Sequence, residues 1–214
     1  MTILFSNPPW WEAKESRGFL RKKRWRRGVR AGSRWPFTYL GRCTPDNPRA
    51  KDYIPYPFFL GYSTTYTAKE IGDNEVFFRD SIAISESYKS FYKYLDSINK
   101  KLKYFVIESA TPSWEHDYNL IKEVKKKYPH LKIVVAGPIS TSDEKWDSKI
   151  VHAVLKGEYE KNIVKVLEGK TGVLNHDLLT KEEMNAAPIP YYDNMIYNKY
   201  FDGNPIPMNV LHPQ

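Results

Sequence analysis

The chain has 214 residues, of which 41% are hydrophobic and 15% aromatic, so it can bury a substantial core and wholesale disorder is excluded. Its net charge of +8 results from 33 Lys and Arg residues against 25 Asp and Glu residues. The single cysteine, Cys43, excludes an internal disulfide framework and a zinc or iron–sulfur cluster held by cysteines of this chain.

The sequence carries no sign of membrane insertion or export. A membrane-spanning helix needs about 18 or more consecutive apolar residues, and no window of this chain approaches that length. Residues 1–5 lack the basic start and the long apolar run of a secretory signal. We therefore expect a cytoplasmic protein without a membrane partner.

The positive charge is concentrated in one segment. Between Glu12 and Arg34 there are ten Lys and Arg residues and two Glu, a surplus that equals the net charge of the whole chain. Trp25 and Trp35 lie among these cations, a combination that suits nucleic-acid phosphates and stacked bases. It equally suits covering a ligand, docking on an acidic partner domain, or a solvated loop. We treat residues 12–52 as a basic insertion.

Short apolar runs alternate with longer amphipathic ones along the first 170 residues. In chain order, the expected elements are a strand at 2–6, a helix at 57–71, a strand at 75–80, a helix at 87–99, a strand at 103–108, a helix from 112 or 113 to 127, a strand at 131–136, a short helix at 143–149, a strand at 150–155 and a helix at 158–167. Helical crossovers between consecutive strands make those strands parallel. The pattern predicts a doubly wound, five-stranded parallel α/β sheet of the flavodoxin-like or Rossmann-like class over residues 1–170.

The remaining residues, 171–214, behave differently. The stretch 184–193 is rich in Pro and Tyr and has no helical period, and Pro205, Pro207 and Pro213 keep the rest extended. We expect an extended linker that lies on a surface, such as that of a neighbouring domain.

Open parallel sheets bind ligands beyond the carboxyl ends of their strands. The segments that follow the five expected strands are 7–10, 80–81, 109–113, 137–140 and 157–160. Four of the five are small and polar, so they allow a ligand to approach the backbone closely. Asp80 and Glu108 end strands and are candidates for catalysis, although strand-terminal carboxylates are more commonly capping or surface groups.

Several familiar motifs are absent from the sequence. There is no Gly-x-Gly-x-x-Gly, no Gly-x-x-x-x-Gly-Lys-Ser/Thr and no Gly-x-Ser-x-Gly, which argues against dinucleotide binding, triphosphate binding and a serine nucleophile elbow. The five histidines include no pair at metal-binding spacing, and His152 is better explained as a packed residue than as a ligand.

Short motifs nevertheless follow the strand ends in a fixed order. They are Asn7-Pro8-Pro9, Tyr56-Pro57-Phe58, Val106-Ile107-Glu108-Ser109-Ala110-Thr111-Pro112-Ser113 with Asp117, Val134-Val135-Ala136-Gly137-Pro138 and Lys156-Gly157-Glu158-Tyr159-Glu160. In this order the chain resembles the N-terminal cobalamin-binding domain of the B12-dependent radical S-adenosylmethionine enzymes. Ala187-Pro188-Ile189-Pro190 also looks like the linker that precedes the catalytic barrel of that family. The resemblance covers nearly the whole chain. It is weakest over the basic insertion.

The resemblance implies that a corrinoid lies across the carboxyl edge of the sheet, with its nucleotide tail between the first and third strands. Ser109, Thr111 and Ser113 would hydrogen-bond the tail and its phosphate, and Gly137 and Pro138 would leave room for it. The full set of cofactor-binding residues that it implies is Asn7, Pro8, Pro9, Trp10, Ser109, Ala110, Thr111, Pro112, Ser113, Asp117, Gly137, Pro138, Ile139, Ser140, Gly157, Glu158 and Tyr159.

Two departures from the family limit what this chain is expected to do. Corrinoid domains that place a histidine on cobalt carry Asp-x-His-x-x-Gly after the first strand, and residues 7–12 here read Asn-Pro-Pro-Trp-Trp-Glu. We therefore expect cobalamin to bind without a protein histidine on cobalt. The catalytic half of the family needs Cys-x-x-x-Cys-x-x-Cys for a [4Fe–4S] cluster that cleaves S-adenosylmethionine, and this motif is absent. The cluster and S-adenosylmethionine would then belong to a radical catalytic domain or subunit, most often a methyltransferase, and the chain alone would be catalytically incomplete.

Two other functions remain open at this point. The first is a nucleic-acid-binding module that uses the Arg/Trp-rich loop 17–35, with the sheet as a scaffold. The second is an α/β enzyme that acts on a small ligand such as a nucleotide sugar. The lack of a convincing acid/base pair in the sequence argues against this function. For two of the loops a purely structural role is also open: helix capping for 109–113, and a tight turn into a helix for 157–160.

Overall fold

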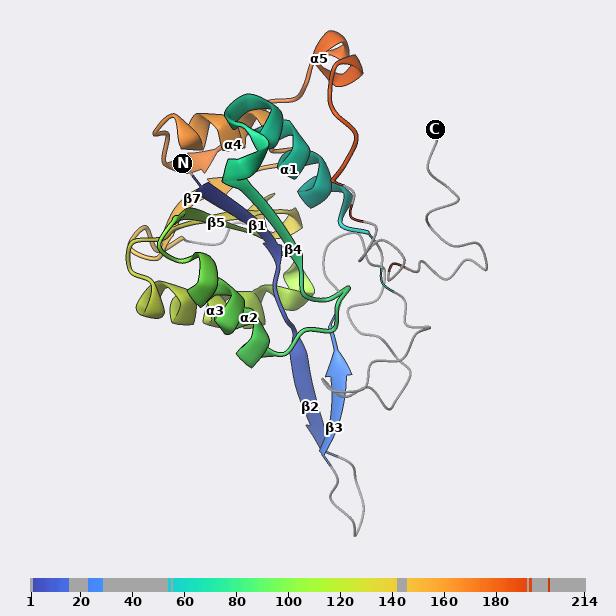
Figure 1. Ribbon diagram of the computed structural model, residues 1–214, viewed down its shortest axis with the longest axis vertical. Helices are drawn as coiled ribbons and strands as arrows, with labels where there is room; N and C mark the ends of the chain where they lie inside the picture. The colour runs from blue at the N-terminus through green and yellow to red at the C-terminus, as the bar shows by residue number, and fades with distance from the viewer. Residues whose placement is uncertain are drawn as a thin grey trace.

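A parallel sheet of six strands forms the centre of the computed structural model (Figure 1). The structure describes residues 2–15, 23–28, 54, 56–141, 146–191, 193 and 200. In chain order, the strands of this sheet are β1 (Thr2–Asn7), β4 (Val76–Asp80), β5 (Leu102–Glu108), β6 (Lys132–Ala136), β7 (Val151–Leu155) and β8 (Gly172–Leu174).

The strand order is β4-β1-β5-β6-β7-β8, and every neighbouring pair is parallel. The first five strands therefore follow the order 2-1-3-4-5 of flavodoxin-like sheets, with the order reversing between β1 and β5. The doubly wound parallel architecture is confirmed, but the expected number of five strands is wrong. The sixth strand, β8, has three residues and forms the sheet edge beside β7, so it is too short to show an alternating pattern in the sequence.

Four helices connect the strands and cover both faces of the sheet. They are α1 (Phe58–Ile71), α2 (Tyr88–Ile98), α3 (Trp114–Lys127) and α4 (Glu160–Leu167), each within two residues of an expected helix. Helices α1 and α4 lie on one face, and α2 and α3 lie on the other (Figure 1). The start of α2 follows from its sequence, because the Ser87 side chain accepts a hydrogen bond from the Ser90 amide at 3.2 Å.

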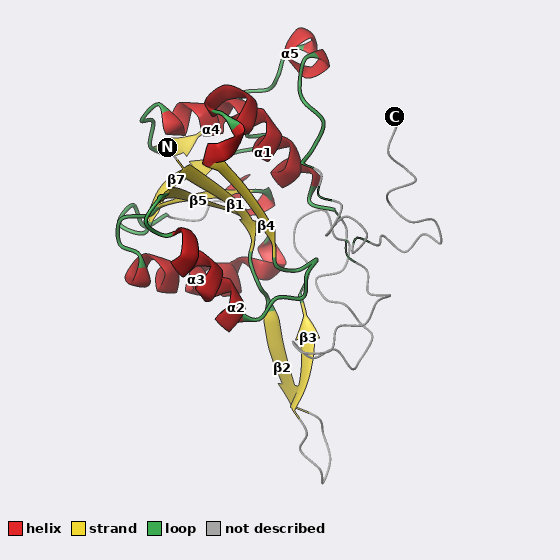
Figure 2. Cartoon of the chain, in the orientation of Figure 1, coloured by secondary structure: helices red, strands yellow, loops and turns green. Residues whose placement is uncertain are grey.

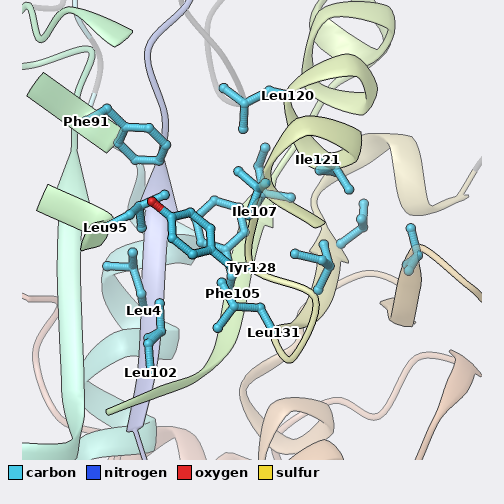
Figure 3. Packing of buried hydrophobic residues seen from close by; sticks show 14 of the residues in the cluster. Leu4, Phe91, Leu95, Leu102, Phe105, Ile107, Leu120, Ile121, Tyr128 and Leu131 are labelled. Atoms are coloured by element: carbon cyan, nitrogen blue, oxygen red, sulfur yellow. The ribbon is translucent and has the colours of Figure 1, made fainter. Parts of the chain in front are cut away.

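Two apolar clusters hold these layers together. Side chains alternate between the faces of a strand, so Phe105 and Ile107 of β5 pack under α2 and α3, whereas Tyr104 and Val106 pack under α1 and α4. Figure 3 shows the first cluster, in which Phe91 of α2 lies close to the β5 side chains. Continuous apolar strands such as β5 and β6 are typical of a parallel sheet that is covered on both sides.

The helix expected at 143–149 is not formed by the described residues of that stretch. Residues 146–150 form a turn, and the expectation for 142–145 lies outside the described residues. The link from β6 to β7 instead begins with a short 3-10 helix over Pro138–Thr141. Ile139 and Ser140 of this 3-10 helix are buried.

The basic insertion contains an antiparallel hairpin that was not expected. Strand β2 (Trp11–Glu15) pairs with β3 (Lys23–Arg27), and Glu12 lies opposite Arg26 in the register. The hairpin projects away from the carboxyl end of β1 (Figure 2). Residues 16–22 and 29–53, including Cys43, lie outside the described residues.

The segment after residue 170 is only partly extended, which corrects the expectation for it. It contributes β8 and a short helix, α5 (Lys181–Asn185), that is capped by Thr180. It then returns along α1, where the Tyr191 amide donates to the Gly61 carbonyl at 3.1 Å and Thr65 Oγ1 donates to the Ile189 carbonyl at 2.8 Å. The surface on which this segment lies is therefore helix α1 of the same domain. Among the described residues, no helix combines the length and apolarity needed to cross a bilayer.

Candidate functional site

The carboxyl ends of β1 and β4 are closed by a buried hydrogen-bond network. Asp80 Oδ1 accepts from Asn7 Nδ2 at 3.0 Å and from the Ile82 and Ala83 amides at 3.0 and 3.1 Å. Asp80 Oδ2 accepts from the Tyr200 hydroxyl at 2.9 Å, and burial together with Asp80 raises the pKa of Tyr200. The side chains of Asn7, a predicted site residue, and Asp80, at the end of β4, therefore hydrogen-bond to each other and to neighbouring groups of the same chain.

Predicted site residue Trp10 belongs to the core. It is fully buried in a small cluster with Ile54, Tyr56 and other apolar side chains, and its ring stacks on that of His116 with 5.8 Å between ring centroids. Gly28 lies so close that a Cβ there would fall 2.0 Å from the Trp10 ring. Trp10 thus anchors the base of the hairpin, and its neighbours Pro8 and Pro9 are buried with it.

The loop after β5 turns its hydroxyls inward. Ser109 and Ser113 are fully buried, and Ser109 Oγ donates to Asp117 Oδ2 at 2.7 Å. Ser113 Oγ accepts from the Ala110 amide at 3.2 Å and donates to the Ala110 carbonyl at 3.1 Å. These contacts are those of a turn that starts a helix, whereas Thr111 and Pro112 are exposed at its tip.

A cavity of about 330 Å³ opens over the carboxyl ends of β5, β6 and β7. It lies one strand away from the point where the strand order reverses, on the face that α1 and α4 cover. Its lining residues are Phe59, Glu108, Gly137, Pro138, Thr141, Gly157, Glu158, Tyr159, His176 and Leu178. The volume lies at the low end of the range of about 300–1,000 Å³ typical of small-ligand pockets.

Glu108 is the acidic group buried in this lining. It ends β5 with 3% of its surface exposed, and its Oε2 has no hydrogen-bond partner among the described residues. Burial, assisted by the carboxylates of Glu160 and Asp80, raises the pKa of Glu108 to about 7. Leu60 and Tyr159 oppose this rise only in part.

Tyr159 is the second buried polar group of the lining. Its side chain is 1% exposed, and its hydroxyl also lacks a hydrogen-bond partner of good geometry in the described part of the chain. Burial, with the nearby carboxyls of Glu108 and Glu160, raises the pKa of Tyr159, so this phenol stays protonated. Both oxygens are enclosed by the protein, and the Glu108 carboxyl lies close to the Tyr159 hydroxyl and the Leu60 backbone.

Two glycines shape the cavity because they adopt conformations that other residues rarely do. Gly137 has φ of +87°, and a Cβ there would fall 2.7 Å from both Glu108 Cγ and the Ser109 carbonyl oxygen. Gly157 has φ of +72°, and a Cβ there would fall 2.0 Å from His176 Nδ1. Both positions need glycine for their backbone and for the close approach of a neighbour.

The predicted site residues fall into two groups, those that line the cavity and those that lie elsewhere. Five of them line the cavity: Gly137, Pro138, Gly157, Glu158 and Tyr159. The others lie outside its lining, in the network, core and turn described above or, for Ile139 and Ser140, buried behind Pro138. The cavity lies over β5–β7, whereas the resemblance implies a tail between the first and third strands.

Sequence reasoning missed several lining residues. His176 and Leu178 follow β8, so identifying that strand would have marked them as strand-end residues. Glu108 was noted at a strand end, but its burial comes from α1 and α4, which the local sequence does not reveal. Phe59 is exposed on the outer part of α1, and no sequence signal distinguishes it.

Within the described residues, no group of three or more His, Cys, Asp or Glu side chains could hold a metal ion. Comparison with protein-family models, with curated proteins and with solved structures gave no match to this chain.

Proposed function

We propose that this chain binds cobalamin at the carboxyl edge of its sheet and serves as the B12 domain or subunit of a radical S-adenosylmethionine enzyme, a methyltransferase of the cytoplasm. The observation that carries the proposal is the cavity over β5–β7. Five of its ten lining residues are ones that the resemblance assigned to cofactor binding. The flavodoxin-like order of the first five strands also supports it, because such sheets bind ligands at this edge.

The residues of the cavity fit one part of the cofactor. A volume of about 330 Å³ accommodates the flat base of the nucleotide tail but not a whole corrinoid, so the macrocycle would remain outside, over the strand ends. Apolar side chains of Phe59, Pro138 and Leu178 suit the faces of an aromatic base.

The protein's contribution in this role is placement. Bound cobalamin supplies a cobalt ion that can accept and donate a methyl group. The glycines at 137 and 157 keep the cavity open, and the half-exposed side chains of Phe59 and Leu178 give it apolar surface. The strand-end loops form a rigid edge, because the Ser109–Asp117 and Asn7–Asp80 bonds fix their conformation.

Reconstitution tests the proposal directly. The full chain is mixed with hydroxocobalamin, desalted and examined by visible absorption, and we expect it to retain the corrinoid in about equimolar amount. Paramagnetic spectra of the Co(II) form should lack nitrogen splitting from a protein imidazole. A protein that leaves the desalting column without colour contradicts cobalamin binding, and imidazole splitting contradicts the expected coordination.

The same preparation tests whether the chain is catalytically incomplete. We expect no reductive cleavage of S-adenosylmethionine in the presence of dithionite, because the chain lacks the three closely spaced cysteines of the cluster motif. Cleavage by the purified chain would overturn this part of the proposal.

Nucleic-acid binding is a second candidate, supported by the projecting hairpin of the basic insertion. Strand β3 reads Lys-Arg-Trp-Arg-Arg, and it extends away from the sheet (Figure 1). Binding to RNA or DNA whose affinity falls steeply with salt concentration would favour this function. Reversing the charge of Arg24 and Arg26 should then abolish that binding without changing the retention of cobalamin.

A further inference from the structure

The edge of the sheet opposite the cavity, where the strands begin, carries a second basic surface. Three segments that are far apart in the sequence meet there, because β5, β6 and β7 are parallel neighbours: residues 99–104, 124–133 and 149–153. Together they contain eight Lys and two His residues, and no Asp or Glu. We call these three segments the amino-edge surface. It forms only when the chain folds, so the near balance of charge outside the basic insertion conceals it.

Part of this positive charge has a structural explanation. Helices α2 and α3 end at this edge, and the free carbonyls at a helix C-terminus attract cations. Lys125 Nζ donates to the Pro129 and Leu131 carbonyls at 2.9 and 2.7 Å. Lys127 Nζ lies 2.9 Å from Asp96 Oδ2. The fold therefore accounts for these two lysines.

Four other lysines of the amino-edge surface are not neutralised. Lys103, Lys126 and Lys149 are exposed and Lys132 is half-buried. None of the four forms an ion pair with another described residue. Lys132 Nζ donates to the Tyr104 hydroxyl at 3.2 Å, which is a neutral acceptor. Four ammonium groups thus gather here without a counter-charge from the described part of the chain.

His152 of β7 reports the field that lysines create at this edge. Its ring lies 6.2 Å from that of Tyr104, centroid to centroid, and its buried Nε2 has no hydrogen-bond partner among the described residues. Burial, together with the charges of Lys132 and Lys125, lowers the pKa of His152. Both charged groups that act on this imidazole are cations, so the edge is a region of positive potential.

The residue types on this surface favour one class of partner. Protein–protein interfaces are enriched in aromatic residues and Arg and depleted in Lys, whereas Lys is a common contact to nucleic-acid phosphates. The three segments contain no Arg, and their aromatic side chains other than Phe or Trp, which are absent, are Tyr104 and Tyr128, both 3% exposed. The surface therefore offers charge without a platform on which unpaired bases could stack.

We propose that the amino-edge surface binds the phosphate backbone of a duplex nucleic acid without sequence preference. Neighbouring strands lie about 5 Å apart, so the cations at the starts of three strands span about 10 Å. A duplex carries about one negative charge per 1.7 Å of its axis and presents several phosphates over that distance. Contacts to phosphates hold a duplex but do not read its sequence.

This surface is separate from the two sites proposed above. The cavity lies at the carboxyl edge, so the inference goes beyond cobalamin binding and does not rest on it. The hairpin of the basic insertion follows the carboxyl end of β1 and projects from that edge (Figure 1). A duplex bound at the amino edge therefore contacts different residues from one bound by the hairpin.

The experiment measures binding of the full chain to a fluorescein-labelled DNA duplex by fluorescence anisotropy, between about 25 and 200 mM KCl. The variant Lys103→Ala/Lys126→Ala/Lys149→Ala should lower the affinity at least about tenfold at the lowest salt. It should also make the slope of log affinity against log salt shallower by about 3. An RNA duplex and a scrambled DNA duplex should bind the wild-type chain within about threefold of the first probe. Unchanged affinity and slope in the variant would overturn the proposal.

A matched variant separates this surface from the charge of the whole chain. Lys89→Ala/Lys93→Ala/Lys181→Ala removes three exposed lysines that lie away from the amino edge, and it should change the affinity by less than about threefold. Equal losses in the two triple variants would contradict a defined binding surface. Circular dichroism of each variant confirms that the compared proteins are folded.

A second comparison separates this surface from the hairpin. In a chain that carries Arg24→Glu and Arg26→Glu, the three amino-edge substitutions should still lower the affinity at least about tenfold. If the hairpin change abolishes duplex binding and the amino-edge change has no effect, the hairpin is the nucleic-acid surface and this proposal is wrong. Cobalamin retention enters neither comparison, so failure of the proposed function is seen separately.

Two further measurements identify the partner and the place of contact. Vesicles with about 30% phosphatidylserine, and polyglutamate, should bind at least about tenfold more weakly than the duplex at equal anion concentration. Equal or tighter binding of either probe would overturn the assignment to a nucleic acid. The pKa of His152, followed by NMR and assigned with His152→Gln, should rise when the duplex binds, because phosphates offset the charges of Lys125 and Lys132. An unchanged pKa would contradict contact at this edge.

Discussion

The two halves of the carboxyl edge of the sheet differ, because a cavity opens over only one of them among the described residues. Over β1 and β4, and in the turn after β5, the polar groups bond to one another, as in the pairs Asn7–Asp80 and Ser109–Asp117. Over β5–β7, Glu108 and Tyr159 line a cavity, and each keeps a buried oxygen without a partner among the described residues.

This contrast also separates residues that stabilise the fold from residues that line the cavity. A bond such as Ser109–Asp117 stabilises the folded state, whereas burial of Glu108 destabilises the folded state whenever this carboxyl is charged. Variants in the closed half should therefore change stability, and variants in the open half should change binding. The predictions that follow test this division from the largest expected effect to the smallest.

Gly137→Ala should destabilise the fold by about 4 kcal/mol, because a Cβ there meets backbone and the Glu108 side chain at 2.7 Å on top of the strain of a positive φ. Gly169→Ala is the matched control, since Gly169 has φ of +107° with no atom within 4 Å of its Cβ position. It should lose only about 1–2 kcal/mol of unfolding free energy in urea. Equal losses of unfolding free energy in the two variants would show that the residues around Gly137 can move to accommodate a Cβ.

In the ligand-free chain, Glu108→Gln should remove a pH-dependent loss of unfolding free energy that amounts to about 3 kcal/mol in the wild type. The folded-state pKa of Glu108 is raised from 4.5 to about 7, so the folded state binds more protons than the unfolded state in this window. Wild-type stability therefore falls as pH rises from about 4.5 to about 7, relative to the variant. Urea unfolding of both proteins at pH 4.5, 6 and 8 measures the difference. If the unfolding free energies of the two proteins depend on pH in the same way, ionising the buried Glu108 does not destabilise the fold.

Ser109→Ala should lower the unfolding free energy by about 2 kcal/mol, because it removes a buried donor from the Asp117 carboxylate. Cobalamin affinity of the folded variant should stay within about threefold of wild type. Loss of cobalamin with unchanged stability would break the comparison, and would instead support the direct tail contact that the resemblance implies for Ser109.

Tyr200→Phe should cost about 1 kcal/mol, since Asp80 loses one of its donors and keeps Asn7 Nδ2 and the amides that follow it. The effect should be absent in an Asp80→Ala background, because this change removes the only group at position 80 that accepts from the Tyr200 hydroxyl. Additive effects in this double-mutant cycle would show that the Tyr200 hydroxyl contributes independently of Asp80.

Much of the fold could be predicted from local patterns. The apolar runs of β5 and β6 and the amphipathic period of α2 and α3 are properties of short stretches of chain, and their bounds agree with the structure within one or two residues. The hairpin and β8 escaped prediction, because β8 depends on pairing with β7 and the hairpin is composed of residues typical of a charged loop.

The candidate site could be predicted only in part for the same reason. Local sequence determined where each strand ends, and therefore which loops lie at the carboxyl edge, including those of Gly137 and Gly157. It could not determine which hydroxyls are already satisfied, since the Ser109–Asp117 bond depends on how α3 packs. It also could not determine the environment of Glu108, which α1, α4 and the segment after β8 enclose together. Periodicity and turn chemistry act over a few residues, whereas burial and hydrogen-bond completion depend on elements that only the folded chain brings together.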